Sequence, residues 1–298
     1  MISFLAANII TLFLPSVVMS SVPTSERQAL VELFGATDGM HWKNATNWLN
    51  GDPCENKWFG IFCNANDTHV LEVFPNPRYS GNRMQGTIPA SFWKDLPRLE
   101  HIYLSNDRPP GWSNLTGHIP SSIGNLTRLK CLYLSHAGNM TGTLPSSMSK
   151  LINLQGLFLR WTNFEGLLPD LSKARNLSKI VIDSSPIDGL CPNICKNRFN
   201  GTLNVLSTWD LPLTHLDVAG NDFSGTFPKK LCQIKKCTAW GNHFSLPSRP
   251  KNCCAGIDGG ISSVSGNNID DMDDMDRRKD VGITPVVYEC HAHKFPRL

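Results

Sequence analysis

A four-residue motif, Gly-x-hydrophobic-Pro, recurs along most of the chain. It occurs six times, as GTIP, GHIP, GTLP, GLLP, GLCP and GTFP, with successive prolines 23 to 36 residues apart. Upstream of each motif lies a short apolar segment: LEV, IYL, LYL, LFL, IVI or LDV. Alternating inward and outward residues are typical of short β-strands. The pattern therefore predicts one short strand in each repeat.

Each repeat predicts one turn of a solenoid. The cleanest turn is 154–176, in which we expect Leu157 and Leu159 to point inward. One turn cannot bury this apolar side alone, so successive turns must stack. The predicted fold class is an α/β solenoid of about six to seven turns, with a parallel sheet on its concave side. The core of the 154–176 turn is completed by Leu154, Phe164 and Leu168.

The pattern LxxLxLxxNxLxGxIP resembles the plant-type extracellular leucine-rich repeat. The chain is similar to polygalacturonase-inhibiting proteins and to receptor-like kinase ectodomains over about residues 22–246. This resemblance implies an asparagine ladder, in which one side chain per turn bonds neighbouring backbone. The ladder asparagines are Asn76, Asn221 and Asn242, while Asp107, Thr162 and Ser185 stand at the equivalent place in other turns. We therefore expect a weakened ladder.

The chain divides into four predicted parts. Residues 1–21 are mostly apolar and end in small residues, which predicts a signal peptide. An uncleaved anchor is the alternative, because the apolar stretch is just long enough to span a membrane. Residues 22–69 are the predicted N-terminal cap and 70–246 the repeats. Residues 247–298 are a C-terminal cap remnant followed by an Asp-rich tail, expected to be disordered.

The predicted N-terminal cap begins with a helix. Ser25-x-x-Gln28 has the form of a capping box. The resemblance implies a disulfide between Cys54 and Cys63, with Trp58 packed beside it. One side of the helix carries Ala29, Leu30, Leu33 and Phe34.

The remaining cysteines fall near the last turn or stand apart. Cys131 and Cys290 are the expected free thiols or an unusual pair, and Cys191 lies close to Cys195. By resemblance, four others belong to a disulfide-stapled C-terminal cap, with connectivity left open: Cys232, Cys237, Cys253 and Cys254.

Seven Asn-x-Ser/Thr sequons support export. Together with ten cysteines and the apolar leader, they predict a secreted glycoprotein with disulfides, placed outside the cell, in the cell wall or at the cell surface. The predicted glycosylation sites are Asn44, Asn66, Asn114, Asn125, Asn139, Asn176 and Asn200.

Catalytic and metal-binding motifs are absent from the sequence. There is no GxSxG, HExxH or phosphate-cradling glycine loop. The acidic run Asp270–Asp280 lacks the spaced ligands of a calcium loop, and Cys290-His291-Ala292-His293 lacks a fourth metal ligand. A net charge of +3 is too low for a dedicated nucleic-acid binder. We predict no enzyme activity, cofactor, metal or nucleic-acid partner, and no membrane span after the leader.

The concave face carries the predicted ligand-binding residues. Its middle outward row is predicted to read Glu72, Tyr103, Tyr133, Phe158, Val181, Asp217. Exposed aromatic rings near arginine are typical of binding hot spots, whereas the alternative is that the rings support one another across the sheet. Other outward positions are His101, Asn106, Lys130 and Asp183. The predicted site is Tyr103, Tyr133, His136, Phe158, Arg160, Trp161, Lys179 and His215.

These observations favour a recognition protein. We expect it to bind a protein, a peptide or a cell-wall polysaccharide on the concave face. Inhibition of a secreted, pectin-degrading hydrolase is the narrower role that the resemblance implies. Alternatives are a structural cell-wall or matrix glycoprotein without a specific ligand and a co-receptor-like surface protein. Irregular turn lengths disfavour ice binding.

Overall fold

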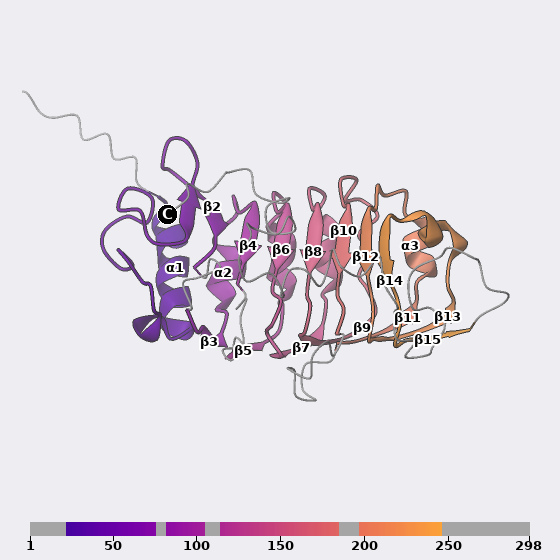
Figure 1. Cartoon of the computed structure of the whole chain (residues 1–298). Coiled ribbons are helices and arrows are strands. Elements are labelled where there is room, and N and C mark those ends of the chain that lie inside the picture. The colour runs from indigo at the N-terminus through magenta and orange to yellow at the C-terminus, as the bar shows by residue number, and fades with distance from the viewer. Residues whose placement is uncertain (1–21, 76–81, 105–113, 185–196, 246–298) are drawn as a thin grey trace, which may run out of the picture.

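The computed structural model describes residues 22–75, 82–104, 114–184 and 197–245. The predicted sheet is present and is eight-stranded in this part of the chain (Figure 1). Its neighbouring strands are parallel except for the antiparallel pair β1 and β2. In spatial order the strands are β1 (Ile61–Cys63), β2 (Val70–Val73), β4 (His101–Tyr103), β6 (Cys131–Tyr133), β8 (Gly156–Phe158), β10 (Lys179–Val181), β12 (His215–Asp217) and β14 (Lys236–Thr238).

A second parallel sheet, which the sequence analysis did not predict, runs along the lower edge in Figure 1. Its strands contain the glycines of the repeated motif. Gly86 has φ 109°, and a Cβ there would lie 2.1 Å from the carbonyl oxygen of Ala36, so only glycine fits. The strands are β3 (Gln85–Thr87), β5 (Asn114–Gly117), β7 (Asn139–Thr143), β9 (Asn163–Gly166), β11 (Arg198–Thr202), β13 (Asp222–Thr226) and β15 (His243–Ser245).

Helices connect the two sheets in several turns, although the turn between β9 and β10 has none. Most begin after the proline of the motif, which fixes φ and cannot donate a backbone hydrogen bond. The α-helices are α1 (Thr24–Ala36), α2 (Ala90–Lys94) and α3 (Asn204–Thr208). The 3₁₀ helices are η1 (Gly39–His41), η2 (Ser121–Asn125), η3 (Ser146–Lys150) and η5 (Lys229–Gln233).

The core lies between the two sheets and the helices. Leu157 and Leu159 are both fully buried, as predicted, and Leu154 and Phe164 join them, whereas Leu168 is partly exposed. Each fully buried side chain of this size contributes about 1.5–3 kcal/mol. One inward-pointing residue from each strand lies next to its counterpart on the neighbouring strand, which forms a continuous apolar row along the solenoid: Ile102, Leu132, Leu157, Ile180 and Leu216.

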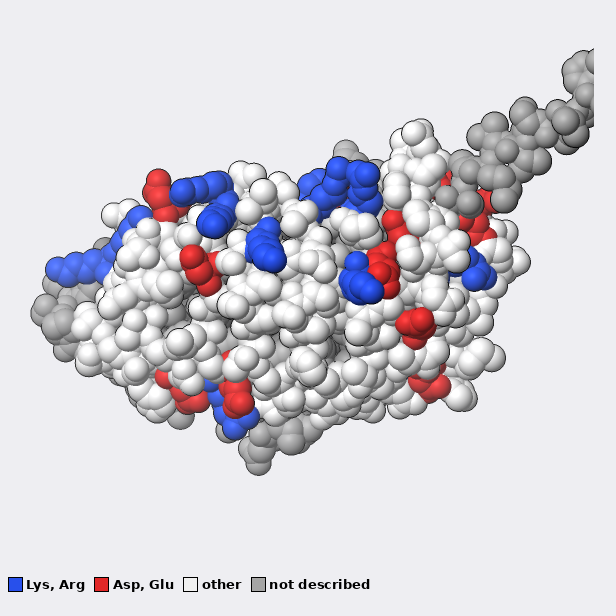
Figure 2. Space-filling model, turned by 180° about the vertical axis from the view of Figure 1, so that it is seen from behind, with Lys and Arg blue, Asp and Glu red and all other residues white. Residues whose placement is uncertain are grey.

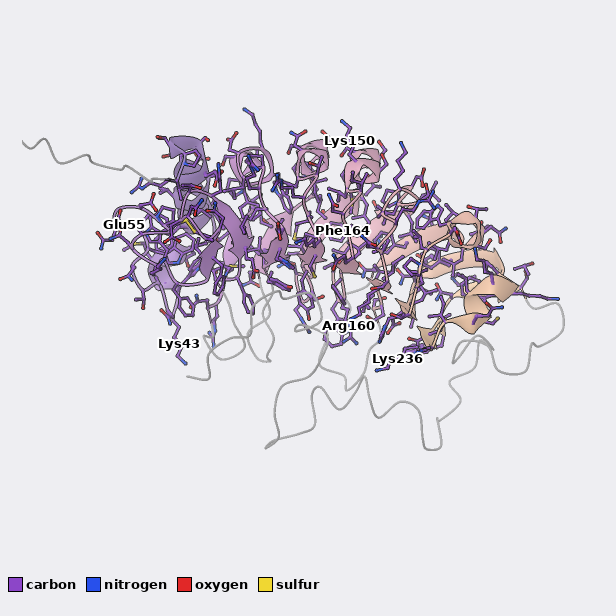
Figure 3. The ribbon with its side chains drawn as sticks, turned by 90° about the horizontal axis from the view of Figure 1, so that it is seen from above. Lys43, Glu55, Lys150, Arg160, Phe164 and Lys236 are labelled. Atoms are coloured by element: carbon purple, nitrogen blue, oxygen red, sulfur yellow. A yellow bond between two sulfur atoms is a disulfide. The ribbon has the colours of Figure 1, made fainter. Side chains whose placement is uncertain are left out.

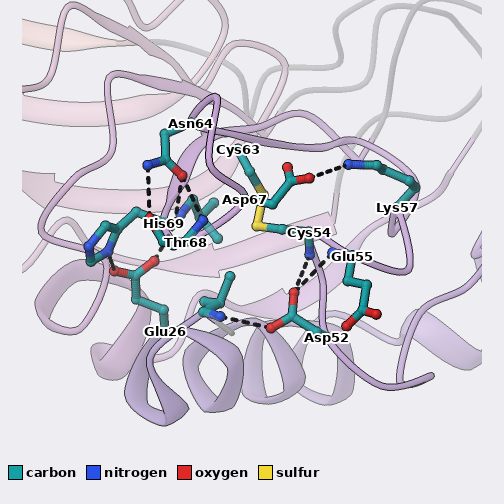
Figure 4. Close-up of a disulfide and its surroundings, with 12 residues drawn as sticks. Glu26, Asp52, Cys54, Glu55, Lys57, Cys63, Asn64, Asp67, Thr68 and His69 are labelled. Atoms are coloured by element: carbon teal, nitrogen blue, oxygen red, sulfur yellow. Dashed lines mark hydrogen bonds and ion pairs between the residues drawn. A yellow bond between two sulfur atoms is a disulfide. The ribbon is translucent and has the colours of Figure 1, made fainter. Parts of the chain in front are cut away.

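The N-terminal cap confirms the predicted disulfide and corrects the predicted capping box. Cys54 and Cys63 are bonded, with Cα atoms 5.8 Å apart (Figure 4). Helix α1, however, begins two residues earlier than the box requires, with Pro23 in the N-cap position, so Ser25 lies inside its first turn and makes no cap hydrogen bond. Gln28 instead donates to Glu32. The predicted buried side of the helix is confirmed, since Ala29, Leu30, Leu33 and Phe34 are all buried.

The asparagine ladder is more complete than the sequence predicts. Asn221 and Asn242 donate to backbone carbonyls of the preceding turns, as expected. Asn197, which the sequence analysis missed, donates to the carbonyls of Leu159 and Ile182 and accepts from the hydroxyl of Thr162. The other predicted ladder positions, 76, 107 and 185, lie outside the described residues.

Gly201 corrects the division of the fifth turn. The sequence analysis took GLCP (189–192) as the motif of this turn. In the structure, Gly201 has the positive φ of the motif glycines, and its strand β11 pairs with β9 and β13. Gly201 is therefore the motif glycine of this turn. The sequence analysis did not recognise Gly201 as a motif glycine, because it is followed by Thr-Leu-Asn and the proline of the motif is missing.

The C-terminal cysteines are described in part. Cys232 and Cys237 are both disulfide-bonded, as the resemblance implies. Cys131 carries a buried thiol. The cysteines at 191, 195, 253, 254 and 290, the leader 1–21 and the tail 246–298 lie outside the described residues.

Candidate functional site

Two outward rows of the first sheet form the centre of the concave face. In the first row, His101, Cys131, Gly156, Lys179, His215 and Lys236 are in register. In the second row, Tyr103, Tyr133, Phe158, Val181, Asp217 and Thr238 are in register. Glu72 pairs with His101, which corrects its predicted place beside Tyr103. Phe74 lies beside Tyr103 instead, with ring centroids 5.1 Å apart.

The first half of this face, from β2 to β8, is an apolar cluster. Successive rings contact one another, with centroids 6.1 Å apart for Tyr103 and Tyr133 and 5.4 Å for Tyr133 and Phe158. Tyr103 and Phe158 are only 1% exposed, and Cys131 is fully buried. The prediction that Tyr103 and Phe158 are exposed is therefore wrong. Each ring buries its faces against its neighbours, which is the alternative that the sequence left open.

The second half of the face, from β10 to β14 with the residues that follow β8, is polar. Arg160 makes two hydrogen bonds to the carboxylate of Asp183, of 2.7 and 3.2 Å. The Arg160 side chain is 18% exposed, whereas Asp183 is 1% exposed. Paired geometry of this kind is stronger and more directional than a single ion pair. Arg160 is therefore held in one orientation at the edge of the concave face.

Trp161 and His136 extend this ion pair into a platform. The Trp161 and His136 ring centroids are 4.4 Å apart, and the guanidinium carbon of Arg160 lies 4.7 Å from the centre of the Trp161 ring. All three side chains are partly exposed. We name His136, Arg160, Trp161 and Asp183 the ring platform.

The backbone beneath the platform is unusual. His136 and Trp161 have positive φ, of 61° and 49°. The corresponding residues of the later turns are Gly220 and Gly241, with φ of 65° and 68°. A bulky residue in this conformation is strained, and strain of this kind is concentrated at functional sites. The two rings therefore occupy positions where glycine would fit the backbone better.

Burial and neighbouring charges shift three pKa values on this half of the face. Burial, and then the nearby Asp183 carboxylate, raise the pKa of Asp217 to about 7. Burial lowers the pKa of His136 to about 3, with the Arg160 charge adding to the effect. Burial and the charges of Lys179 and Lys236 lower the pKa of His215 to about 4. Both histidines are therefore neutral near pH 7.

A side view places the platform relative to the rest of the molecule. In Figure 3 Arg160 and Lys236 point away from the ribbon on one side, Lys150 points away on the opposite side, and Phe164 lies between them. Figure 2 shows the face opposite to the view of Figure 1, where Lys and Arg side chains form separate groups and no continuous basic patch.

Comparisons with known proteins find similar repeat proteins. A family model described as Leucine Rich Repeat matches residues 212–234, which contain β12 and β13. The chain is 29% identical over 145 residues to Protein STRUBBELIG-RECEPTOR FAMILY 3 of Arabidopsis thaliana, covering 42% of this chain and 17% of the relative. It is 33% identical over 117 residues to Pollen receptor-like kinase 3 of the same plant, covering 38% and 16%.

The chain has the leucine-rich repeat solenoid fold. It spans less than a fifth of the length of these curated relatives. Among solved structures it is similar to a crystal structure of a pollen receptor kinase 3, with TM-score 0.49, 24% identity and coverage of 68% of this chain and 88% of that chain. It is also similar to the BIR2 ectodomain from Arabidopsis thaliana, with TM-score 0.48, 21% identity and coverage of 74% and 94%.

The leucine-rich repeat chain exposes most of its sequons. Asn44 is partly exposed, and the other six are exposed: Asn66, Asn114, Asn125, Asn139, Asn176 and Asn200. Three of them lie on strands of the second sheet, β5, β7 and β11. None lies on a strand of the first sheet in the described part of the chain. All seven predicted glycosylation sites are therefore accessible to solvent, and their glycosylation stays a prediction.

Several site features could not have been found from the sequence. Glu26 is 1% exposed and accepts from His69 and from the backbone of Val70, forty-four residues away (Figure 4). The approach of Asp217 to Asp183 and Arg160 depends on the register of separate turns. The one available signal was the polar residue at position 217 in a row of apolar residues.

Other classes of site receive no support within the described residues. No group of three His, Cys, Asp or Glu side chains there is arranged to hold a metal ion. No helix in those segments has both the length and the apolar character to cross a membrane.

Proposed function

We propose that this leucine-rich repeat protein is an extracellular glycoprotein that binds a protein or peptide ligand through the second half of its concave face. The ring platform carries the proposal, because it presents a tryptophan and an oriented arginine together, and these residue types dominate binding hot spots. Its strained backbone supports a role beyond packing.

The names of the similar proteins support a recognition role. The curated relatives are named as a receptor-family protein and a receptor-like kinase, and one solved structure with a similar fold is a peptide hormone receptor in complex with RGF2. In addition, we propose that this chain has no enzyme activity and needs no cofactor. We also propose that residues 1–21 direct its export and that 22–69, 70–246 and 247–298 are the cap, repeat and tail units. A polysaccharide or secreted hydrolase as partner stays a prediction, since no described residue singles out either.

Replacing Trp161 tests the proposal. Trp161→Gly introduces the residue that later turns use at this position, so the variant keeps the backbone conformation and loses only the ring. The purified glycosylated chain is immobilised, incubated with secreted proteins and peptides, and the retained molecules are identified by mass spectrometry. Their affinity for wild type and variant is then measured with purified material.

We expect the affinity to fall at least about tenfold in Trp161→Gly. Lys150→Ala is the matched control, because Lys150 is exposed on the opposite side of the solenoid (Figure 3). A ligand that binds Trp161→Gly and wild type equally would show that the platform is not the binding site. Equal melting temperatures of the three proteins would exclude unfolding as the cause of any loss.

A further inference from the structure

One guanidinium interacts with two buried carboxyl groups on the polar half of the concave face. Arg160 makes two hydrogen bonds to Asp183, which follows β10. Asp217 is the last residue of the neighbouring strand β12, where it is in register with Val181, two residues before Asp183. Residues two apart on a strand leave the same side of the sheet, so the two carboxyl groups lie on one side. Both are buried, and both act on the charge of Arg160.

This cluster has more acidic than basic groups. With both carboxyl groups ionised, two buried negative charges would be matched by the single positive charge of Arg160. A like charge in a buried site disfavours the second ionisation, so one of the two carboxyl groups retains its proton to a higher pH. Asp217 is that group, since Asp183 has the direct hydrogen bonds to Arg160. Burial, followed by the Asp183 carboxylate, raises the pKa of Asp217 to about 7.

The other titratable groups near this cluster differ from Asp217 in their behaviour near pH 7. In the described part of the chain they come from β6, β10, β12, β14 and the residues after β6: Tyr133, His136, Lys179, His215 and Lys236. Both histidines are neutral near pH 7, because burial lowers their pKa values to about 3 and 4. The charges that act on Asp217 are those of Asp183 and Arg160. The histidines therefore keep one charge state while Asp217 loses its proton.

The strand order gives the direction in which a charged Asp217 attracts the guanidinium. His136 follows β6, Arg160 and Trp161 follow β8, Asp183 follows β10, and Asp217 ends β12. The Trp161 ring lies against His136, with centroids 4.4 Å apart. The rings of the platform are therefore on one side of Arg160, and the two carboxyl groups are on the other. A second negative charge on β12 attracts the guanidinium away from the Trp161 ring.

We infer that Asp217 is a positioning residue of the ring platform, which leaves Arg160 to Asp183 when it carries a proton and competes for Arg160 when it is charged. In the protonated state, Arg160 keeps its two hydrogen bonds and its place 4.7 Å from the centre of the Trp161 ring. In the charged state, this contact with the ring is weakened. The inference rests on the proposed function, because it names the regulation of the same site: the platform binds its ligand more tightly below pH 7 than above it.

A fluorine label on tryptophan tests the inference without a ligand. The full glycosylated chain is produced with 5-fluorotryptophan, and its fluorine NMR spectrum is recorded from pH 5 to pH 9. The resonance that is absent from the spectrum of Trp161→Gly belongs to Trp161. We expect this resonance to move with pH in wild type, with a midpoint at about 7. In Asp217→Asn, which has a neutral amide in place of the carboxyl group, it should stay close to the low-pH position of wild type.

Asp210→Asn is the matched control for this titration. Asp210 precedes the same strand β12, but its side chain is exposed and lies 3.9 Å from the ammonium group of Lys230. The control therefore removes one carboxylate from the same turn without changing the buried cluster. The Trp161 resonance of Asp210→Asn should move with pH as it does in wild type.

The same exchange predicts how binding depends on pH. The apparent affinity of the platform scales with the fraction of chains in the binding-competent state, which here is the fraction with Asp217 protonated. With a pKa of about 7, the affinity should fall about tenfold between pH 6 and pH 8. Asp217→Asn should bind the ligand equally well at both pH values, whereas Asp210→Asn should lose affinity as wild type does.

Two results would overturn the inference: a Trp161 resonance that does not move between pH 5 and pH 9 in wild type, or equal movement in wild type and Asp217→Asn. Neither result bears on the proposed function, because no ligand is present in the NMR titration. If the proposed function fails instead, Trp161→Gly retains every ligand of wild type. The fluorine titration still decides in that case whether Asp217 controls the contact between Arg160 and Trp161.

Discussion

The two halves of the concave face have the same strand geometry and opposite chemistry. From β2 to β8 the outward residues are mostly aromatic rings and a thiol buried against one another, and Val181 of β10 joins this cluster. From β10 to β14 the other outward residues are lysines, a histidine, a threonine and a carboxyl group, next to an arginine bound by a second carboxylate. The inward residues are leucine, isoleucine and valine from β2 to β12, and Cys237 takes the inward position on β14. Inward residues therefore set the stacking of the turns, while outward positions are free to take different roles.

The largest expected effect separates structural from functional residues on this face. Phe158→Ala should lower the free energy of unfolding by about 3–5 kcal/mol, because it leaves a cavity among buried rings. Lys236→Ala, on the same face but exposed, should change it by less than about 0.5 kcal/mol. Chemical denaturation followed by circular dichroism measures both. A loss of less than about 1 kcal/mol for Phe158→Ala would mean that the two halves are equally open to solvent.

A smaller effect is expected from the ion pair of the polar half. Asp183→Asn should lower the free energy of unfolding by about 2 kcal/mol. This loss of stability is smaller than for a fully buried ion pair, because the Arg160 side chain is partly exposed to water. Asp217 also lies near Arg160 and interacts with its charge after Asp183 is replaced. The exposed pair between Arg198 and Glu165 provides the comparison. Glu165→Gln should cost less than about 0.5 kcal/mol.

A double-mutant cycle sharpens this second prediction. Arg160→Gln combined with Asp183→Asn should cost less than the sum of the two single changes, since the second change removes a partner that is already unpaired. Additive losses would show that Arg160 and Asp183 do not stabilise one another.

A separate prediction concerns the pH dependence of stability that comes from Asp217. Its pKa is about 7 in the folded chain and 3.8 by reference, so between these values the folded state holds a proton that the unfolded state has lost. Stability contributed by this group is therefore present below about pH 4 and falls as the pH rises towards 7.

Asp217→Asn isolates this contribution. The lowered pKa values of His136 and His215 make stability rise with pH, which is the opposite of the effect of Asp217. The variant keeps both histidines, so their contributions cancel when the stability of the variant is compared with that of wild type. Melting temperatures of both chains from pH 4 to 8 measure it. We expect Asp217→Asn to gain stability relative to wild type as the pH rises. Parallel profiles would show that Asp217 is ionised throughout.

The sequence predicted the parts of this molecule that repeat. Strands such as β8, with Leu157 inward, follow from alternation, and the disulfide between Cys54 and Cys63 follows from the resemblance to a known family. The helix side formed by Leu30 and Leu33 follows from spacing within one element. Each of these depends on neighbours close in sequence or on a pattern present several times.

The sequence could not predict features that depend on contacts between turns. Burial of Tyr103 and Phe158 requires their neighbours to fill the space above the sheet, and alternation gives only the side to which a residue points. The second sheet forms because positive φ at glycines such as Gly86 allows a close approach between turns. Asn197 joins the ladder although no complete motif follows it.

The positions of the described disulfide-bonded cysteines predict how thermal unfolding of this molecule begins. Cys54 and Cys63 lie in the N-terminal cap, and Cys232 and Cys237 lie near the end of the described repeats. A linear stack has contacts on both sides of every internal layer but on one side only at its termini, so fraying on heating begins there. Covalent bonds at these two places hold the layers that would otherwise loosen first. A reducing agent should therefore broaden the melting transition as well as lower its midpoint.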